Sequence, residues 1–305
     1  MNKLLKTALF AAGAAAAVAA AAVALTAPGR AAPEKKEKLY GRNVAHRGLH
    51  ESDGLPPENS LSAFREAARE GYGAEMDVRL TADGVPVILH DENTQRMCGV
   101  DRLVAETPLE ELETLRLGDT QESIPTLSQA LEAMEGGGPV LLELKSGAYN
   151  DVLCEAVAEA IRDWGGDACV QSFDPRIVAW FRKNAPEIFR GQLTDSFRNL
   201  REATCPLLAF AVSHGLTNFI ARPQYIAHGP GRKSLLIRLA ELLGAMPVAW
   251  TAHSCADQVD NDAVIFEYFR PLPQYKWLLH QADPFPEDDF LPDTDNGALS
   301  EDDLL

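Results

Sequence analysis

The alternation of short apolar runs with longer helical patterns limits the possible folds of this chain more than any other feature of the sequence. Most of the apolar runs are continuous, as expected for strands that are buried on both faces. Repeated strand-helix units over roughly 240 residues predict one parallel (β/α)8 barrel, a TIM barrel, covering 39–282. We expect its strands at 43–46, 74–79, 85–90, 140–143, 168–172, 190–193, 207–212, 247–250 and 263–266. These are nine candidates for eight places, so at least one of them must be wrong.

Two expected helices have clear start and stop signals, and two breaks interrupt the repeat. One helix begins with Asn59 or Ser60 as its cap and ends at Gly71, and the other covers about 150–166. The second and third expected strands are separated by little more than a Thr-Ala-Asp-Gly turn, which is too short for a crossover helix. A polar stretch with one short helix then follows at about 92–125, and we expect a small insertion there, after the third strand.

The first 38 residues are expected to lie outside the barrel. Lys3 and Lys6 precede the stretch 8–25, which is uncharged and rich in alanine. This pattern indicates a signal peptide or a single membrane anchor. Alanine is only weakly apolar, which favours cleavage near Ala27, whereas the uncharged stretch is long enough to remain as a tilted span. In both cases we expect an exported, extracytoplasmic protein that is secreted or anchored to the cell membrane.

The charge of the chain excludes one class of partner. The net charge is −17, and Lys3 and Lys6 are the only charged residues before Arg30, so the remainder carries −17 minus 2, or −19. Such a body has no general basic field, and we expect no nucleic-acid binding. The stretch 283–305 holds nine Asp and Glu and no Lys or Arg. We expect it to be an acidic, disordered tail.

Three carboxylates fall on expected strands in a pattern typical of a metal site. Glu75 and Asp77 are two residues apart, so their side chains point to the same face of one strand. Two carboxylates buried together repel each other unless a cation lies between them. Glu143, at the end of another apolar strand, completes a set of oxygen ligands suited to Mg²⁺ or Ca²⁺. The five cysteines contain no C-x-x-C pair and indicate no zinc site.

Two histidines and two cations accompany these carboxylates. His46 and His90 each close an expected strand, and the carboxyl ends of barrel strands are where active sites are built. Because histidine titrates near neutral pH, the pair could divide the roles of general acid and general base. Arg47 and Lys145 would supply fixed positive charge for an anionic phosphoryl group. We further expect Glu58 to hold Arg47 or the metal, Asn59 to cap the next helix, and Gly48 to allow close approach of the backbone.

These motifs together resemble one known family. The segments AHRG, PENSLSAFREAAREGYGAEMDVRLTADGVPVILHDE and LLELK are similar to the signature of the glycerophosphodiester phosphodiesterase family. That signature pairs His-Arg-Gly with Pro-Glu-Asn, Glu-x-Asp, a Thr-x-Asp-Gly turn and His-Asp. The similarity is tightest over 44–92 and looser to about 270, which is some three quarters of the chain.

The resemblance implies a fold, a reaction and a set of site residues. It implies a TIM barrel with a small insertion, one divalent cation on Glu75, Asp77 and Glu143, and His46 and His90 as the acid-base pair. Substrates would be glycerophosphodiesters, cleaved to glycerol 3-phosphate and an alcohol. In the mechanism that it implies, the neighbouring glycerol hydroxyl attacks phosphorus to give a cyclic phosphate, which water then opens.

The late part of the chain departs from the family pattern and leaves the alcohol open. The segments AWTAHS, 249–254, and DAVIFEYFRP, 262–271, differ from the usual sequences on the leaving-group side. Alternative substrates are lysophospholipids or sphingomyelin, cleaved in a phospholipase D-like reaction, or wall glycerophosphate polymers. An acyl chain would need an apolar groove at the barrel mouth, which Phe219, Ile220, Tyr225, Phe266 and Tyr268 could supply. A membrane-tethered binding module without turnover is a further alternative, and the retained histidines and carboxylates argue against it.

Overall fold

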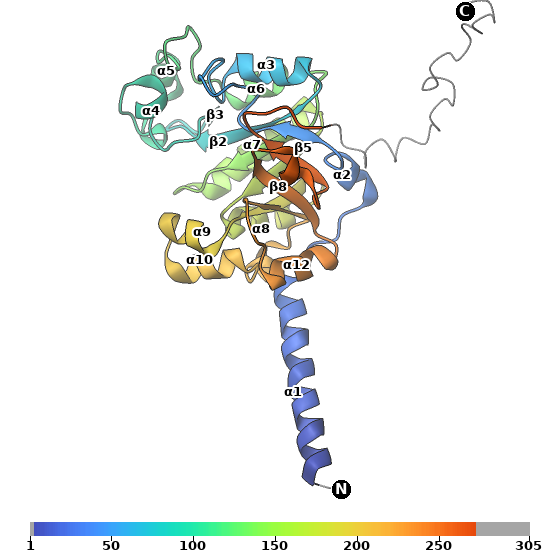
Figure 1. The fold of residues 1–305 in the computed structure, drawn as a ribbon. Helices are drawn as coiled ribbons and strands as arrows, with labels where there is room; N and C mark the ends of the chain where they lie inside the picture. Colours follow the sequence, from blue (N-terminus) through green and yellow to red (C-terminus); the bar gives the residue numbers. More distant parts are fainter. Residues whose placement is uncertain (1–2, 273–305) are drawn as a thin grey trace, which may run out of the picture.

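Eight parallel strands form a closed barrel in the computed structural model, which describes residues 3–272 (Figure 1). The ring is closed because β1 pairs with β2 on one side and with β9 on the other. Its strands are β1 (Asn43–Ala45), β2 (Gly73–Leu80), β4 (Val140–Leu144), β5 (Ala168–Ser172), β6 (Phe189–Thr194), β7 (Tyr225–His228), β8 (Met246–Ala252) and β9 (Ala263–Phe266). The structure confirms the predicted TIM barrel.

Helices surround the barrel and connect its strands. In chain order they are α3 (Leu61–Arg69), α4 (Gln95–Cys98), η1 (Val104–Glu106), α5 (Leu109–Leu112), α6 (Leu127–Ala133), α7 (Asn150–Trp164), α8 (Pro175–Asn184), α9 (Phe197–Ala203), α10 (Pro206–Ser213), α11 (Asn218–Ala221), α12 (Leu235–Leu242) and η2 (Cys255–Gln258). Two predicted helices are confirmed: α3 begins after Ser60, whose hydroxyl accepts from the amide of Ala63, and α7 ends at Gly165 with φ 72°.

The third expected strand exists but does not belong to the ring. β3 (Pro86–Ile88) runs antiparallel to β2 and forms a hairpin with it through the short turn at 81–84. A turn of that length cannot return the chain to a parallel register, because a parallel crossover needs a dozen or more residues. The segment after β3 carries α4, η1 and α5 and packs its own apolar cluster around Val87, Leu112 and Ile124. Figure 1 shows α4 and α5 to one side of the barrel, where the insertion was expected.

The expected strand at 207–212 is wrong, and one strand was missed. Residues 206–213 form α10, which begins with Pro206 at its first turn, where proline is well tolerated. Leu207 and Phe210 are exposed, so the apolar run lies on the surface of a helix instead of in the barrel wall. The eighth place in the ring is taken by β7, a four-residue strand directly after Pro223 and Gln224.

The N-terminal segment is attached to the barrel face opposite the carboxyl ends of the strands. α1 (Lys3–Thr26) projects from this face, and α2 (Pro33–Glu37) precedes β1 (Figure 1). The side chains of Asn218 and Arg222, just before β7, donate to the carbonyls of Thr26 and Ala27 at 3.1 and 2.8 Å. Among the described residues, no helix combines the length and apolarity needed to cross a membrane. The predicted acidic tail, 283–305, lies outside the described residues.

Candidate active site

Three buried carboxylates lie at the centre of the carboxyl-terminal face of the barrel. Glu75 and Asp77 come from β2, and Glu143 comes from β4, where the parallel register places it beside Asp77. One oxygen of each carboxylate lies within 4.8 Å of one oxygen of the other two. Glu75 and Asp77 are fully buried, and Glu143 is 3% exposed. The strand periodicity that predicted this cluster is therefore confirmed in the geometry.

Two cations neutralise part of this negative charge. The Lys145 ammonium lies 2.8 Å from Asp77 Oδ1 and also contacts Glu143, while Arg47 Nε lies 3.2 Å from Asp77 Oδ2. Burial alone would raise the pKa of Asp77, but the charges of Lys145 and Arg47 hold that pKa well below its usual range. The same carboxylates raise the pKa of Lys145 in spite of its burial. Both cations therefore stay charged.

The cluster fits a hard divalent cation. Three carboxylates face two fixed cations, which leaves one negative charge uncompensated in a buried place. Burial, together with Asp77 and Glu143, raises the pKa of Glu75 well above its usual range. Among the described residues, none donates a hydrogen bond to the buried Oε1 of Glu75. An oxygen that lacks a donor, in an all-oxygen set, is what Mg²⁺ or Ca²⁺ would satisfy.

His46 stands beside the carboxylates and is held by a residue that the sequence analysis did not single out. Its Nε2 lies 3.9 Å from Glu75 Oε2, and its Nδ1 lies 2.9 Å from Oε1 of Glu267, the first residue after β9. His50, from the loop after β1, is 6% exposed, with Nε2 3.6 Å from the same oxygen. Burial opposes ionisation of Glu267, but its contacts with His46 and His50 lower its pKa. The available sequence signal for Glu267 was the Ile-Phe-Glu ending, which had been noted only as a difference from the usual sequences.

His90 is part of a network of ion pairs that reaches the insertion. Its Nδ1 lies 2.8 Å from Oδ1 of Asp91, and Arg96 of α4 donates to Oδ2 of Asp91 at 2.6 Å. Arg96 also donates to Glu58, and Glu58 accepts from Nη1 of Arg47 at 2.9 Å. Burial, with the nearby charge of Lys145, lowers the pKa of His90. Glu58 therefore holds Arg47, as predicted, and joins it to the insertion.

Two residues of the loop before α3 have roles that the sequence alone did not assign to them. Asn59, with φ 57°, is not the helix cap: its Nδ2 donates to Asp77 Oδ2 at 2.8 Å. Gly48 has φ 82°, and a Cβ there would lie 2.7 Å from that of Ala63. The packing of α3 against this backbone therefore requires a glycine.

The apolar residues expected to form an acyl groove do not form one. Tyr225 and Phe266 are buried in the barrel, because their side chains lie within the cores on either side of the sheet. Phe219 and Ile220 are exposed on α11, which contacts α1 on the opposite face. Of these five residues, Tyr268 alone lies near the site, with the centroid of its ring 5.3 Å from that of the His50 ring.

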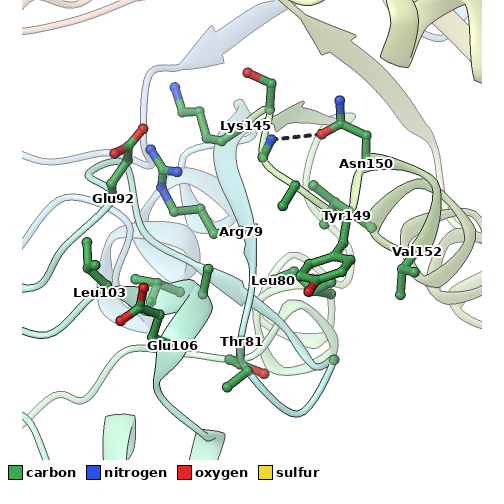
Figure 2. Close-up of a pocket in the computed structure, with 18 of the residues that line it drawn as sticks. Arg79, Leu80, Thr81, Glu92, Leu103, Glu106, Lys145, Tyr149, Asn150 and Val152 are labelled. Carbon is green, nitrogen blue, oxygen red and sulfur yellow. Dashed lines mark hydrogen bonds between the residues drawn. The ribbon is translucent and has the colours of Figure 1, made fainter.

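A groove lies on the Lys145 side of the site. It has a volume of about 600 Å³ and is bounded by the end of β2, the insertion and the start of α7 (Figure 2). Figure 2 shows Arg79, Glu92 and Lys145 at one end and Thr81 at the other. No residue of its walls beyond Lys145 was predicted as part of the site, since the walls come from β2, the insertion and α7, and their meeting depends on the fold.

Comparisons with known proteins agree with this geometry. A family model described as the glycerophosphoryl diester phosphodiesterase family matches residues 46–263. Glycerophosphodiester phosphodiesterase 1 of Bos taurus is 31% identical over 153 residues, which are 46% of this chain and 45% of that protein. A glycerophosphodiester phosphodiesterase of Caldanaerobacter subterraneus is 32% identical over 161 residues, 49% of this chain and 65% of that protein. The matched part of the chain thus spans less than two thirds of these curated relatives.

Solved structures share the fold. A phosphodiesterase of Oleispira antarctica, solved with the product sn-glycerol-3-phosphate, superposes with a TM-score of 0.62 and 25% identity, covering 78% of this chain and 96% of that one. A glycerophosphodiester phosphodiesterase of Thermotoga maritima superposes with a TM-score of 0.56 and 24% identity, covering 74% and 94%. The latter likeness supports the barrel alone.

Proposed function

Because the chain belongs to the glycerophosphoryl diester phosphodiesterase family, we propose that it hydrolyses glycerophosphodiesters to glycerol 3-phosphate and an alcohol with the help of one divalent cation. The observation that carries this proposal is the buried cluster of Glu75, Asp77 and Glu143 with His46 beside it. The Oleispira antarctica phosphodiesterase was solved with glycerol 3-phosphate as its product, which supports the same product for this chain.

Glu75, Asp77 and Glu143 would hold the cation, as Mg²⁺ or Ca²⁺. When bound, such a cation polarises a phosphoryl oxygen and lowers the pKa of a coordinated hydroxyl group. Lys145 and Arg47 hold Asp77 ionised, so this carboxylate keeps its negative charge at neutral pH. In the proposed complex, the side chains of Lys145 and Arg47 also face the anionic phosphoryl group and stabilise its charge.

His46 and His90 would move the protons of the reaction. One imidazole accepts the proton of the attacking glycerol hydroxyl, and the other donates a proton to the alcohol oxygen as its bond to phosphorus breaks. Water then attacks phosphorus in the resulting cyclic phosphate and loses one proton. The ring oxygen that leaves phosphorus gains one proton, which gives glycerol 3-phosphate. Each histidine has Nδ1 beside a carboxylate, Glu267 or Asp91, which leaves Nε2 of each ring for the substrate.

We propose that residues 1–38 direct export and either are removed or retain the protein at the cell membrane, so that the barrel acts outside the cytoplasm. The uncharged stretch 8–25 after Lys3 and Lys6 supports this proposal. Separation of cytoplasmic, membrane and external fractions of the source cells, with detection of the chain, tests it directly.

The test of function is release of glycerol 3-phosphate from glycerophosphocholine by the purified chain. We expect release with Mg²⁺ or Ca²⁺, none with excess chelator, and a loss of kcat of about 10²- to 10⁴-fold in His46→Ala. His214→Ala is the matched control, because His214 follows α10, outside the cluster, and its Nδ1 contacts the carbonyl of Phe210. Tight substrate binding without turnover in the presence of both cations would favour the binding module instead.

A further inference from the structure

The groove beside Lys145 begins where the carboxylate cluster ends. Its near end contains Lys145, which lies 2.8 Å from Asp77, and Arg79, which is two residues beyond Asp77 on β2. Arg79 donates to the carbonyl of His90 through Nε and Nη2, at 3.0 and 2.6 Å. A group attached to a phosphorus atom at the cluster could therefore enter the groove between the two cations without crossing another part of the site.

Beyond this cationic end, the walls of the groove are mainly apolar. Leu103 from the insertion, and Tyr149 and Val152 from the start of α7, are 44%, 66% and 47% exposed. Leu80 and Leu153 belong to the same apolar lining, and Figure 2 labels Leu80 and Tyr149 among the residues around the hollow. Large apolar side chains gathered around one hollow remain hydrated at a cost in free energy, and a hydrocarbon ligand would relieve this cost.

The size and charge of the groove select among ligands. A short alcohol with six or seven heavy atoms needs on the order of 200 Å³, at about 30 Å³ per water-sized group. The groove has about 600 Å³, within the range of pockets that bury drug-sized ligands. Arg79 and Lys145 lie at the same end of the groove as Glu92, so this end offers no excess of negative charge to bind a cationic alcohol. Glu92 and Glu106 are exposed, and polar groups of a ligand could remain hydrated beside them.

We infer that this groove binds a single hydrocarbon chain of the substrate, so that the preferred diester is of the lysophospholipid type and not one with a short polar alcohol. The inference rests on the proposed function, since it assigns the substrate of that same site. The chain could be carried by the leaving alcohol or by the glycerol, and the groove offers the same apolar chemistry to both.

The experiment compares two series of synthetic glycerophosphodiesters below their aggregation concentrations. In the first series the leaving alcohol lengthens from ethanol to butanol, hexanol and octanol, and release of glycerol 3-phosphate is measured. In the second series ethanol leaves from diesters with alkyl ethers of the same lengths on the glycerol, and ethanol release is measured. Each methylene that enters the groove should raise kcat/KM by about two- to fourfold.

Variants connect the chain-length effect to the groove. Leu103→Asp and Val152→Asp place a charge on exposed wall positions, so they should reduce the slope with chain length and leave hydrolysis of the ethyl substrate unchanged. Leu207→Asp is the control, because Leu207 is 79% exposed on α10, outside the groove, and it should retain the full slope.

The outcomes separate this inference from the proposed function. A slope in one series, lost in both wall variants, supports the inference and shows which part of the diester carries the chain. Equal kcat/KM across both series overturns it, while hydrolysis of the ethyl substrate leaves the proposed function in place. An unchanged slope in Leu103→Asp and Val152→Asp also overturns it. Absence of hydrolysis of every substrate would instead remove the proposed function.

Discussion

At the scale of the residue, Glu267 gives His46 its orientation. The contact between Glu267 Oε1 and His46 Nδ1 fixes which ring nitrogen faces the carboxylate cluster. We expect Glu267→Gln to lower kcat by about 100-fold with little change in KM, since proton transfer by an imidazole typically contributes at least that factor. Steady-state kinetics with glycerophosphocholine measure both constants.

The control for this variant is Glu51→Gln, because Glu51 is an exposed carboxylate in the neighbouring loop that pairs with Arg270. It should behave like the wild type. If Glu267 acts through His46, the double variant Glu267→Gln/His46→Ala will be no slower than His46→Ala alone. Fully additive losses would show that Glu267 acts by another route.

Residue patterns predicted the carboxylate cluster and both histidines because strand periodicity and strand ends are local properties. They did not distinguish Asn59 from Ser60 as the cap of α3, since both types cap helices equally well. The choice depends on Asp77, eighteen positions away in the chain, which accepts from the Asn59 amide in the folded barrel. The burial of His50 likewise depends on Glu267 and Tyr268, at the other end of the barrel sequence.

At the scale of the element, one set of ion pairs fastens the insertion to the barrel. Arg96 of α4 contacts Asp91 and Glu58. Burial alone would raise the pKa values of these two acids, but the contacts with the arginine outweigh burial and lower them. A carboxylate whose pKa is lower in the folded state stabilises above its unfolded pKa and loses this contribution as the pH falls through the folded value.

We therefore expect Arg96→Gln to lower the free energy of unfolding by about 1 kcal/mol at neutral pH, because Arg96 is half exposed and such pairs contribute little more. The difference from wild type should shrink as the pH falls below about 4. Urea unfolding at a series of pH values measures it. Arg162→Gln, which breaks the exposed pair with Glu187, should have a smaller effect. If the difference in the free energy of unfolding between Arg96→Gln and the wild type grew on acidification, the ion pairs of Arg96 with Asp91 and Glu58 would not be its cause.

Sequence patterns identified most strands but not their places in the sheet. The segments 207–212 and 225–228 are both short apolar runs, and their lengths do not separate a surface helix from a buried strand. Pro206 begins the helix that contains the first segment. Just before the second segment, the carbonyl of Pro223 accepts from the amide of Gly29 in the N-terminal segment. β3 was counted as a barrel strand although its turn was too short for a crossover, and turn length was the stronger signal.

At the scale of the whole molecule, the carboxylate cluster links stability to the cation. A cation present at 100 times its dissociation constant stabilises the folded chain by about 2.7 kcal/mol, which corresponds to a Tm higher by about 5 to 10 °C for a barrel of this size. We expect Mg²⁺ or Ca²⁺ to produce such a shift in the wild type and no shift in Glu75→Gln. Thermal unfolding with and without chelator measures both.

In the absence of cation, Glu75→Gln should not lower the stability of the folded chain. A carboxyl whose pKa is raised on folding lowers stability at neutral pH, so Glu75→Gln without cation should be at least as stable as the wild type. The exposed acid Glu66, paired with Arg69 on α3, provides the control Glu66→Gln, which should keep the full shift with cation. A cation shift retained in Glu75→Gln would exclude the cluster as its cause.

The position of β3 outside the ring has a consequence for how this protein can evolve. Because β1 pairs directly with β2, the barrel closes without the hairpin or the segment that follows it. The wall that carries Leu103 can therefore lengthen, shorten or change its sequence while the strands that hold Glu75, Asp77 and Glu143 keep their register. The groove wall at Leu103 and the carboxylates of the cluster thus lie on separable stretches of the chain, so selection can diversify one while it conserves the other.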